Sequence, residues 1–492
     1  MEEGLLSTAE QPRRWGVVLA EEVKKSCYIA LPMVVVTVSQ NLLRVASMSM
    51  VGHLGQLELA GTAVATSLTN VTGFSLLFGM ASALETLCGQ AFGARQYHRL
   101  GTYTYGAMIS LILVCFPISI LWVYIDKLLI LLGQDPLISA EARKFSVWLI
   151  PTLFPYSILQ LFIRYLLSQS LIFPMLWSSV AVLVIHVPVC WALVFPLGFG
   201  TAGAALAIGI SYTLNVMFLG FYLYYSEACE KTRVTFSVDG LKSIREFFHF
   251  AIPSAIMLCL EWWSYEIVVL LSGLLPNPQL ETSVLSICLT VGVLHYYIPY
   301  SFGAAVSTRI SNELGAGNPQ AAKTALLAAT GLGAVEVIIA ITTLLCSRSF
   351  LGYAFGSEQE LVDYVKDITL LLCFTLFADT IQVILSGVAR GSGWQHIGAY
   401  INLGSYYLVG IPMALVLGFV VDLKGKGLWS GLIIGSIVQC ILLTLITCST
   451  SCWSMLTEVN GNSTWSRPLV GYQVFWFTLH YFLHFQLCLF TI

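Results

Sequence analysis

Residues 165–226 read YLLSQSLIFPMLWSSVAVLVIHVPVCWALVFPLGFGTAGAALAIGISYTLNVMFLGFYLYYS, a run of 62 positions without Asp, Glu, Lys or Arg. A membrane span needs only about 20 apolar residues, so this run is long enough for more than one. The whole chain of 492 residues has the same character, because 57% of it is apolar and only 10% is charged, against about 25% charged in soluble domains. The chain is therefore not a water-soluble globule, and we expect it to lie in a bilayer.

Apolar runs separated by polar breaks predict twelve membrane-spanning segments. They lie near residues 27–50, 62–86, 101–125, 141–164, 171–196, 201–226, 247–272, 282–307, 322–346, 360–386, 397–421 and 427–449. Lipid offers the backbone no hydrogen-bond partners, so these segments are expected to be helices, and the alternating polarity of transmembrane strands is absent.

The chain also divides into two similar halves on either side of a charged stretch, residues 227–246. Matching positions recur at a slowly growing spacing: Pro32 with Pro253 at 221, Gln160 with Gln382 at 222, and Pro188 with Pro412 at 224. Such matches indicate a duplicated unit, and six spans in each unit give the parallel-repeat arrangement of transporters.

From these patterns we expect an all-α membrane protein with twelve transmembrane helices in two pseudo-symmetric six-helix lobes. The expected parts are a cytoplasmic segment (1–26), an N-lobe (27–226), a cytoplasmic inter-lobe loop (227–246), a C-lobe (247–449), and a tail (450–492) with an apolar interfacial segment at 474–490.

Charged residues indicate orientation and exclude several partners. With a cytoplasmic N-terminus, 15 of the 23 Lys and Arg residues fall on the cytoplasmic side and 7 on the other, as the positive-inside rule requires. The net charge of −3 offers no basic surface for nucleic acid. We find no phosphate-binding glycine loop and no Cys or His cluster with metal spacing, so we expect no nucleic acid, metal or cofactor.

Six motifs spread over both halves carry a family resemblance. They are MSMVGHLG (48–55), ETLCGQAFGA (85–94), LEWW (260–263), STRISNELGAGN (307–318), GVARGSG (387–393) and GAYIN (398–402). With them the chain resembles the multidrug and toxic compound extrusion (MATE) transporters, most closely the plant detoxification-type branch. The resemblance implies two lobes around a V-shaped cavity, and export of organic cations and other xenobiotics or metabolites in exchange for a cation, usually a proton.

Ionisable side chains inside spans are costly, so they indicate function. Asp379 shares one face of the tenth span with Thr375, Gln382 and Ser386, at spacings of 4, 3 and 4. Such a stripe faces either a cavity or a hydrogen-bonded seam between helices. We interpret it as part of a cavity, with Asp379 as a proton-coupling residue.

Glu261 is the second acid of this kind, and the helix-seven acid of the family matches it. Trp262, Trp263 and Tyr265 surround it with aromatic surface. Apolar surroundings favour the neutral form of a carboxyl group, so we predict that Glu261 takes up and releases protons. Trp262, Tyr265 and Tyr296 are candidate cation-binding residues through cation–π attraction, although aromatic residues at helical spacing are also typical of packing.

The first span offers a different polar face, formed by Thr37, Gln40, Arg44 and Ser47. Many bacterial relatives carry an acid in this span, whereas residues 27–50 contain none, so this span offers no carboxyl group for a proton site. Gln40 occupies the position that matches Glu261. We include Gln40 and Arg44 among the cavity residues, and Arg44 either pairs with Glu85 or contacts anionic parts of a ligand.

Other residues receive smaller roles. Pro32 and Pro253 are expected to bend the first and seventh helices. Glu266 is interpreted as mainly structural, His295 as a core residue, and Glu336 as a partner between helices.

We interpret the chain as a monomeric secondary active transporter that exports small, mainly cationic organic compounds in exchange for protons. It lies in the plasma membrane or the vacuolar membrane. The alternatives are an organic-anion (citrate-like) exporter, a flippase for lipid-linked precursors and, from another class, an intramembrane acyltransferase-like enzyme. The first two need basic residues along the path, where Arg44 stands nearly alone. The enzyme needs a catalytic His paired with Asn or Asp, and we find no such set.

The charge bias makes the orientation testable. A cysteine or protease tag inserted in residues 227–246 should react only from the cytoplasmic face, because this stretch carries several of the positive charges that set topology. Labelling of that tag by a membrane-impermeant reagent outside intact cells would reverse the assignment.

Overall fold

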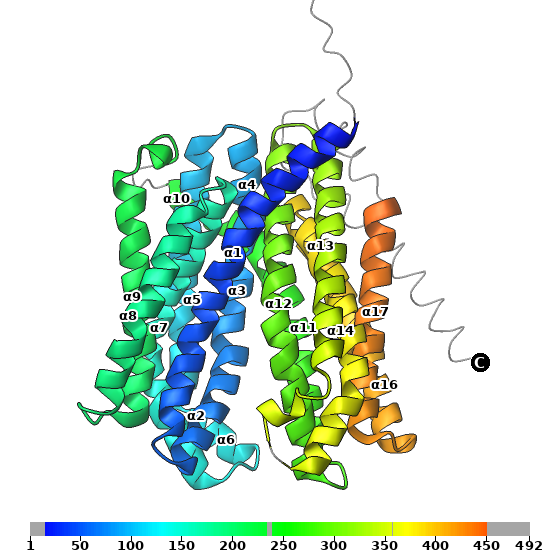
Figure 1. Cartoon of the computed structure of the whole chain (residues 1–492). Helices are drawn as coiled ribbons and strands as arrows, with labels where there is room; N and C mark the ends of the chain where they lie inside the picture. The colour runs from blue at the N-terminus through cyan, green and yellow to red at the C-terminus, as the bar shows by residue number, and fades with distance from the viewer. Residues whose placement is uncertain (1–14, 234–238, 357, 450–492) are drawn as a thin grey trace, which may run out of the picture.

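The computed structural model describes residues 15–233, 239–356 and 358–449 (Figure 1). Over these residues the chain is helical without strands, and twelve helices are long and apolar enough to cross a membrane. The expected all-α fold with twelve spans is therefore confirmed. The apolar segment expected in the tail falls outside the described residues.

The N-lobe is the left half of the molecule in Figure 1. It consists of α1 (Trp15–Gly52), α2 (Gln56–Thr69), the π-helical turn η1 (Asn70–Phe74), α3 (Ser75–Ala81), α4 (Ala83–Gly93), α5 (Tyr97–Val123), α6 (Ile125–Leu131), α7 (Pro136–Ser168), α8 (Phe173–Val194) and α9 (Gly200–Tyr225). The segments from α2 to α4 continue one another as a single span.

The C-lobe is the right half. It consists of α11 (Ile244–Ser272), α12 (Pro278–Gly315), α13 (Pro319–Ser347), η3 (Gly352–Ala354), α14 (Gln359–Ser392), α15 (Gln395–Asn402), η4 (Leu403–Gly410), α16 (Ile411–Leu415), η5 (Val416–Val420) and α17 (Lys424–Ser449). Two of these, η4 and η5, are π-helical. The stretch expected as a loop between the lobes contains the short helices η2 (Glu227–Cys229) and α10 (Asp239–Lys242) and the start of α11.

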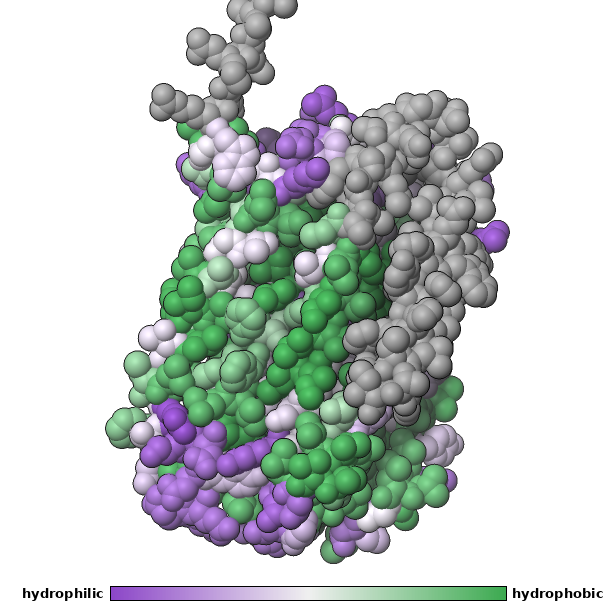
Figure 2. Space-filling model, turned by 90° about the vertical axis from the view of Figure 1, so that its right-hand side faces the viewer, coloured by the Kyte–Doolittle hydropathy of each residue, from purple (hydrophilic) through white to green (hydrophobic). Residues whose placement is uncertain are grey.

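Apolar side chains cover the middle of the outer surface. On the side shown in Figure 2 they form a broad band, with hydrophilic side chains gathered toward the two ends. On α5, Leu113, Phe116 and Ile120 each leave more than half of their surface exposed. Such exposure is unfavourable in water and is expected where helices face lipid tails.

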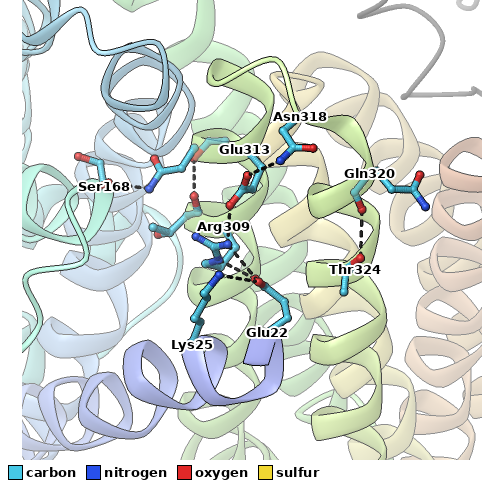
Figure 3. A network of polar contacts seen from close by, with 11 residues as sticks. Glu22, Lys25, Ser168, Arg309, Glu313, Asn318, Gln320 and Thr324 are labelled. Carbon is cyan, nitrogen blue, oxygen red and sulfur yellow. Dashed lines mark hydrogen bonds and ion pairs between the residues drawn. The ribbon is translucent and has the colours of Figure 1, made fainter. Parts of the chain in front are cut away.

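The helix α1 begins at Trp15 rather than at residue 27, and its first turns are held by ion pairs (Figure 3). Arg309 of α12 donates to both carboxylate oxygens of Glu22, at 2.6 and 3.1 Å, and also to Glu313 at 2.5 Å. This contact joins the N-lobe to the end of α12. We call the end of the molecule where α1 begins, at the top of Figure 1, the N-terminal face.

Near this face the motifs that end α4 and α12 pack against each other across the junction of the lobes. A Cβ atom at Gly93 would overlap the carbonyl oxygen of Asn312, and one at Gly315 would overlap that of Gln90. The Asn312 side chain donates to the carbonyl oxygen of Ser168 at 3.0 Å. The glycines therefore allow the two backbones to approach closely.

Glu85 is buried at the same junction, between two arginines. Its carboxylate lies 2.9 Å from Nε of Arg390 on α14 and 3.7 Å from Nε of Arg164 on α7. Arg164 also donates to Gln160 at 2.8 Å and to the Tyr300 hydroxyl at 3.0 Å. The three charged side chains are at most 2% exposed, so each depends on the others for neutralisation.

This dependence predicts a large loss of stability when the carboxylate is removed. Glu85→Ala should lower the free energy of unfolding by about 3–5 kcal/mol, because the Arg390 side chain is left buried without its counter-ion. Unfolding of the purified protein in mixed SDS and mild-detergent micelles measures the change. Asp367→Ala is the control, because Asp367 is 59% exposed and pairs with Lys426 at the surface. Equal and small effects of the two substitutions would show that the junction contributes little.

Candidate functional site

The residues expected to carry protons lie in one polar network of the C-lobe, formed by α11, α14, η4 and α17. Gln382 donates to Glu261 Oε1 at 2.7 Å, and Ser386 donates to Gln382 Oε1 at 3.2 Å. Tyr265 donates to Asp379 Oδ1 at 3.2 Å. The structure thus brings the polar face of α14 together with the acid and the tyrosine of α11.

Three residues of this network were not expected from the sequence. Asn402 donates to the carbonyl oxygen of Met257 on α11 at 2.7 Å, which holds the end of α15 against α11. Gln439 donates to Asn402 at 2.7 Å and to Gln382 at 3.2 Å, and it accepts from the Tyr406 hydroxyl at 2.8 Å. None of them belongs to a polar stripe at helical spacing, and the only signal was that Asn402 ends the motif GAYIN.

The two carboxyl groups have neutral hydrogen-bond partners, Gln382 for Glu261 and Tyr265 for Asp379. Glu261 and Asp379 are 4% and 7% exposed. In the part of the chain that the structure describes, neither lies within 4.0 Å of a Lys or Arg nitrogen. A buried carboxylate without a basic partner is costly, so its charge is offset most readily by a proton or by a bound cation. The arrangement is therefore suited to the exchange of one for the other.

Thr375 lies at the margin of this network. Its hydroxyl donates to the carbonyl oxygen of Leu371 at 3.1 Å and accepts from the indole N–H of Trp429 at 3.0 Å. Thr375 is 2% exposed, so it packs between α14 and α17.

Trp262 and Tyr296 lie at the junction of the lobes, in an aromatic cluster drawn from both. The Trp262 ring stacks on Phe78 of α3 with centroids 5.7 Å apart and meets Tyr296 edge-on at 6.1 Å. Tyr296 stacks on Tyr300 at 5.8 Å. The Arg164 guanidinium lies 4.5 Å from the Phe78 ring centroid, so this aromatic surface borders the Glu85 ion pairs.

The remaining residues named from the sequence make contacts between helices. The helices α1 and α11 continue through Pro32 and Pro253. Glu266 accepts from Ser67 of α2 at 3.1 Å. Nε2 of His295 lies 3.0 Å from Oε1 of Glu336, a contact that links α12 to α13. Thr380 of α14, next to Asp379, donates to the other oxygen of Glu336 at 3.3 Å.

In the N-lobe, the suggested pair between Arg44 and Glu85 is wrong, because Glu85 contacts two other arginines. Arg44 donates to the Tyr212 hydroxyl and to Asn70 Oδ1, both at 3.3 Å. Gln40, one turn before Arg44, is partly buried, and its Nε2 has no hydrogen-bond partner among the described residues.

Comparison with known proteins gives consistent matches. The family model MatE matches residues 32–192 and 253–416. The chain is 53% identical over 428 residues to Protein DETOXIFICATION 3 of Arabidopsis thaliana, covering 87% of this chain and 90% of that protein. It is 54% identical over 430 residues to Protein DETOXIFICATION 14 of the same plant, covering 87% and 89%.

Solved structures agree with these matches. The crystal structure of the eukaryotic MATE transporter AtDTX14 has a TM-score of 0.87 and 52% identity, and the match covers 90% of this chain and 98% of that one. A structure described as the outward-facing conformation of a multidrug resistance MATE family transporter has a TM-score of 0.80 at 16% identity, with 91% and 100% covered. This second likeness concerns the fold alone.

Two neighbouring tyrosines test whether the C-lobe network holds the structure together. Tyr406→Phe should lower the free energy of unfolding by about 1–3 kcal/mol, because Ser436 and Gln439 lose their hydroxyl partner. Tyr407→Phe also removes a buried hydroxyl group, but this one has no hydrogen-bond partner among the described residues. The substitution should therefore leave the free energy of unfolding unchanged. Unfolding of both variants in detergent measures the difference. Equal losses of stability in the two variants would contradict a stabilising role for the Tyr406 hydrogen bonds.

Proposed function

The chain belongs to the MATE family of transporters, and we propose that it exports small, mainly cationic organic compounds in exchange for protons. As a member it is a multi-pass membrane transporter of small organic compounds rather than an enzyme. We propose that it acts as a monomer, with its N-terminal face in the cytoplasm, in the plasma membrane or the vacuolar membrane.

One observation carries the proposal of proton coupling. Glu261 and Asp379 lie buried among neutral hydrogen-bond partners. A chain of hydrogen bonds connects them through Gln382, Gln439, Tyr406, Ser436 and Tyr265. A proton on such a carboxyl group removes the charge that would attract a cation, and loss of the proton restores it. Because the two ligands change each other's affinity by the same factor, the binding of one drives the release of the other.

The energy available to this exchange is sufficient for efflux. Each pH unit across the membrane supplies about 1.4 kcal/mol per proton, and 100 mV supplies about 2.3 kcal/mol per net charge moved. A difference of 1.4 kcal/mol corresponds to a tenfold concentration ratio. Exchange of one proton for one monovalent cation moves no net charge, so each pH unit supports a tenfold gradient of the cation.

The contacts between the lobes support an alternating-access movement. At the N-terminal face the lobes are joined by Glu85 with Arg390, by Asn312 with Ser168, and by Gln395, whose Nε2 donates to Thr86 at 2.5 Å. These contacts close the path between the lobes on that side. In our proposal the cytoplasmic entrance opens when they separate.

Removal of the two titrating groups tests the proposal. Glu261→Gln and Asp379→Asn carry permanently neutral side chains at these positions, so both proteins should fold and reach the membrane. Both should lose export of a fluorescent organic cation driven by a pH gradient in reconstituted vesicles. Gln40→Ala, at the matching position of the N-lobe, should have a much milder effect because no titrating group is removed.

Glu266→Gln is the matched control, because it makes the same chemical change on the same helix outside the network. It should retain proton-driven export. Wild-type rates of proton-driven export in Glu261→Gln and Asp379→Asn, at equal protein density, would rule out the C-lobe mechanism.

A further inference from the structure

Arg44 lies in the N-lobe, away from the two carboxyl groups of the C-lobe, and its charge has no negative partner. Its guanidinium donates to two neutral oxygens, those of Tyr212 and Asn70, both at 3.3 Å. The Phe74 ring lies under it, with the centroid 4.8 Å from Cζ. Over the described residues no carboxylate oxygen lies within 4.0 Å of this side chain.

The contacts that Arg44 makes leave much of its hydrogen-bonding capacity unused. A guanidinium group carries five N–H donors in a planar fork, and two of them are accounted for by Tyr212 and Asn70. Arginine cannot lose its proton to escape an apolar environment, so its charge persists. The remaining donors are thus available to an acceptor with a negative charge.

A cavity opens beside Arg44 in the half of the N-lobe that lies away from the N-terminal face. The cavity has an empty volume of about 410 Å³, part of which is open to the outside. The part of it in which a water-sized group fits is much smaller. The polar residues that line it are Arg44, Ser47, Thr62, Thr66 and Thr69. The other walls are apolar, contributed by side chains such as Phe74, Phe145, Leu149 and Ile208.

Thr62 supplies an independent sign that the cavity takes a ligand. Its side chain is 1% exposed, and its hydroxyl has no hydrogen-bond partner among the described residues, although it lines the cavity. A buried hydroxyl without a partner is unfavourable. A ligand that accepts hydrogen bonds from Thr62 and from Arg44 would satisfy both.

The charge and size of the cavity select the ligand. A cation is excluded by the Arg44 charge, and the polar lining includes a guanidinium and the unpartnered hydroxyl of Thr62, which can both donate to an anion. The small free space admits a compact group and excludes a polycyclic compound. We propose that the N-lobe cavity around Arg44 binds a small monovalent anion, either free chloride or the carboxylate of an organic compound.

The site is separate from the proposed proton coupling, because it lies in the other lobe and shares no residue with the C-lobe network. The purified full-length protein in lipid nanodiscs allows a direct test by chlorine-35 NMR. Chloride bound to a slowly tumbling protein broadens the resonance of the free ion. The sodium salt of HEPES, a bulky sulfonate, keeps the ionic strength constant, and sodium benzoate serves as the carboxylate probe.

We expect saturable chloride broadening in the wild-type protein and its reversal by benzoate. Broadening without reversal by benzoate assigns the site to the inorganic ion. Stabilisation against thermal unfolding by benzoate, without chloride broadening, assigns it to a carboxylate. Arg44→Gln should abolish whichever of these signals the wild-type protein gives.

Two further variants keep the test valid if Arg44→Gln misfolds. Thr62→Val keeps the positive charge and should weaken anion affinity several-fold. Arg143→Gln, at an exposed arginine of the same lobe that lies 3.7 Å from Asp126, should leave it unchanged. Glu261→Gln should also retain anion binding, so failure of the proton-coupling proposal is distinguished from failure of this one. Absence of both signals in the wild-type protein, or their survival in Arg44→Gln and Thr62→Val, would overturn the inference.

Discussion

A buried carboxylate between two arginines joins the halves of this membrane protein. Glu85 and Arg164 belong to the N-lobe and Arg390 to the C-lobe, so Arg390 meets its carboxylate partner only when the lobes come together at the N-terminal face. In a dry junction separation would be prohibitive. If water enters as the lobes part, the charges are hydrated again and the cost falls. The same ion pairs can therefore hold the closed state firmly and still allow the lobes to separate.

The two lobes share a scaffold and differ in the sign of the charge that each holds without an ion-pair partner. The C-lobe holds Glu261 and Asp379 among neutral donors, and the N-lobe holds Arg44 among neutral oxygens and aromatic rings. The two interiors thus attract ligands of opposite charge. Neither site contains a counter-ion of its own among the described residues, so both remain open to ligands from outside the protein.

The sequence predicts the spans well because lipid imposes length and apolarity on every helix. It also places Asp379 and Gln382 on one face, since helical spacing alone decides that. Gln439 gives no such signal, because its importance depends on which helices meet, and that depends on packing between distant segments. The predicted pair of Arg44 with Glu85 is wrong for the same reason. Each buried charge has several possible partners on other spans, and sequence spacing does not show which of them it contacts.

The π-helical turn η4 also explains how the duplicated halves came to differ inside the membrane. The helices that begin at Phe173 and Gln395 start 222 positions apart, whereas Pro188 and Pro412 within them are 224 apart. The two added positions thus fall inside a helix, where the C-lobe has η4 and α8 is a regular α-helix. A π-helical turn accommodates added residues within a helix. Tyr406 lies in that turn, so an insertion within a transmembrane helix gave one half of the repeat a hydrogen-bond donor that the regular helix of the other half lacks.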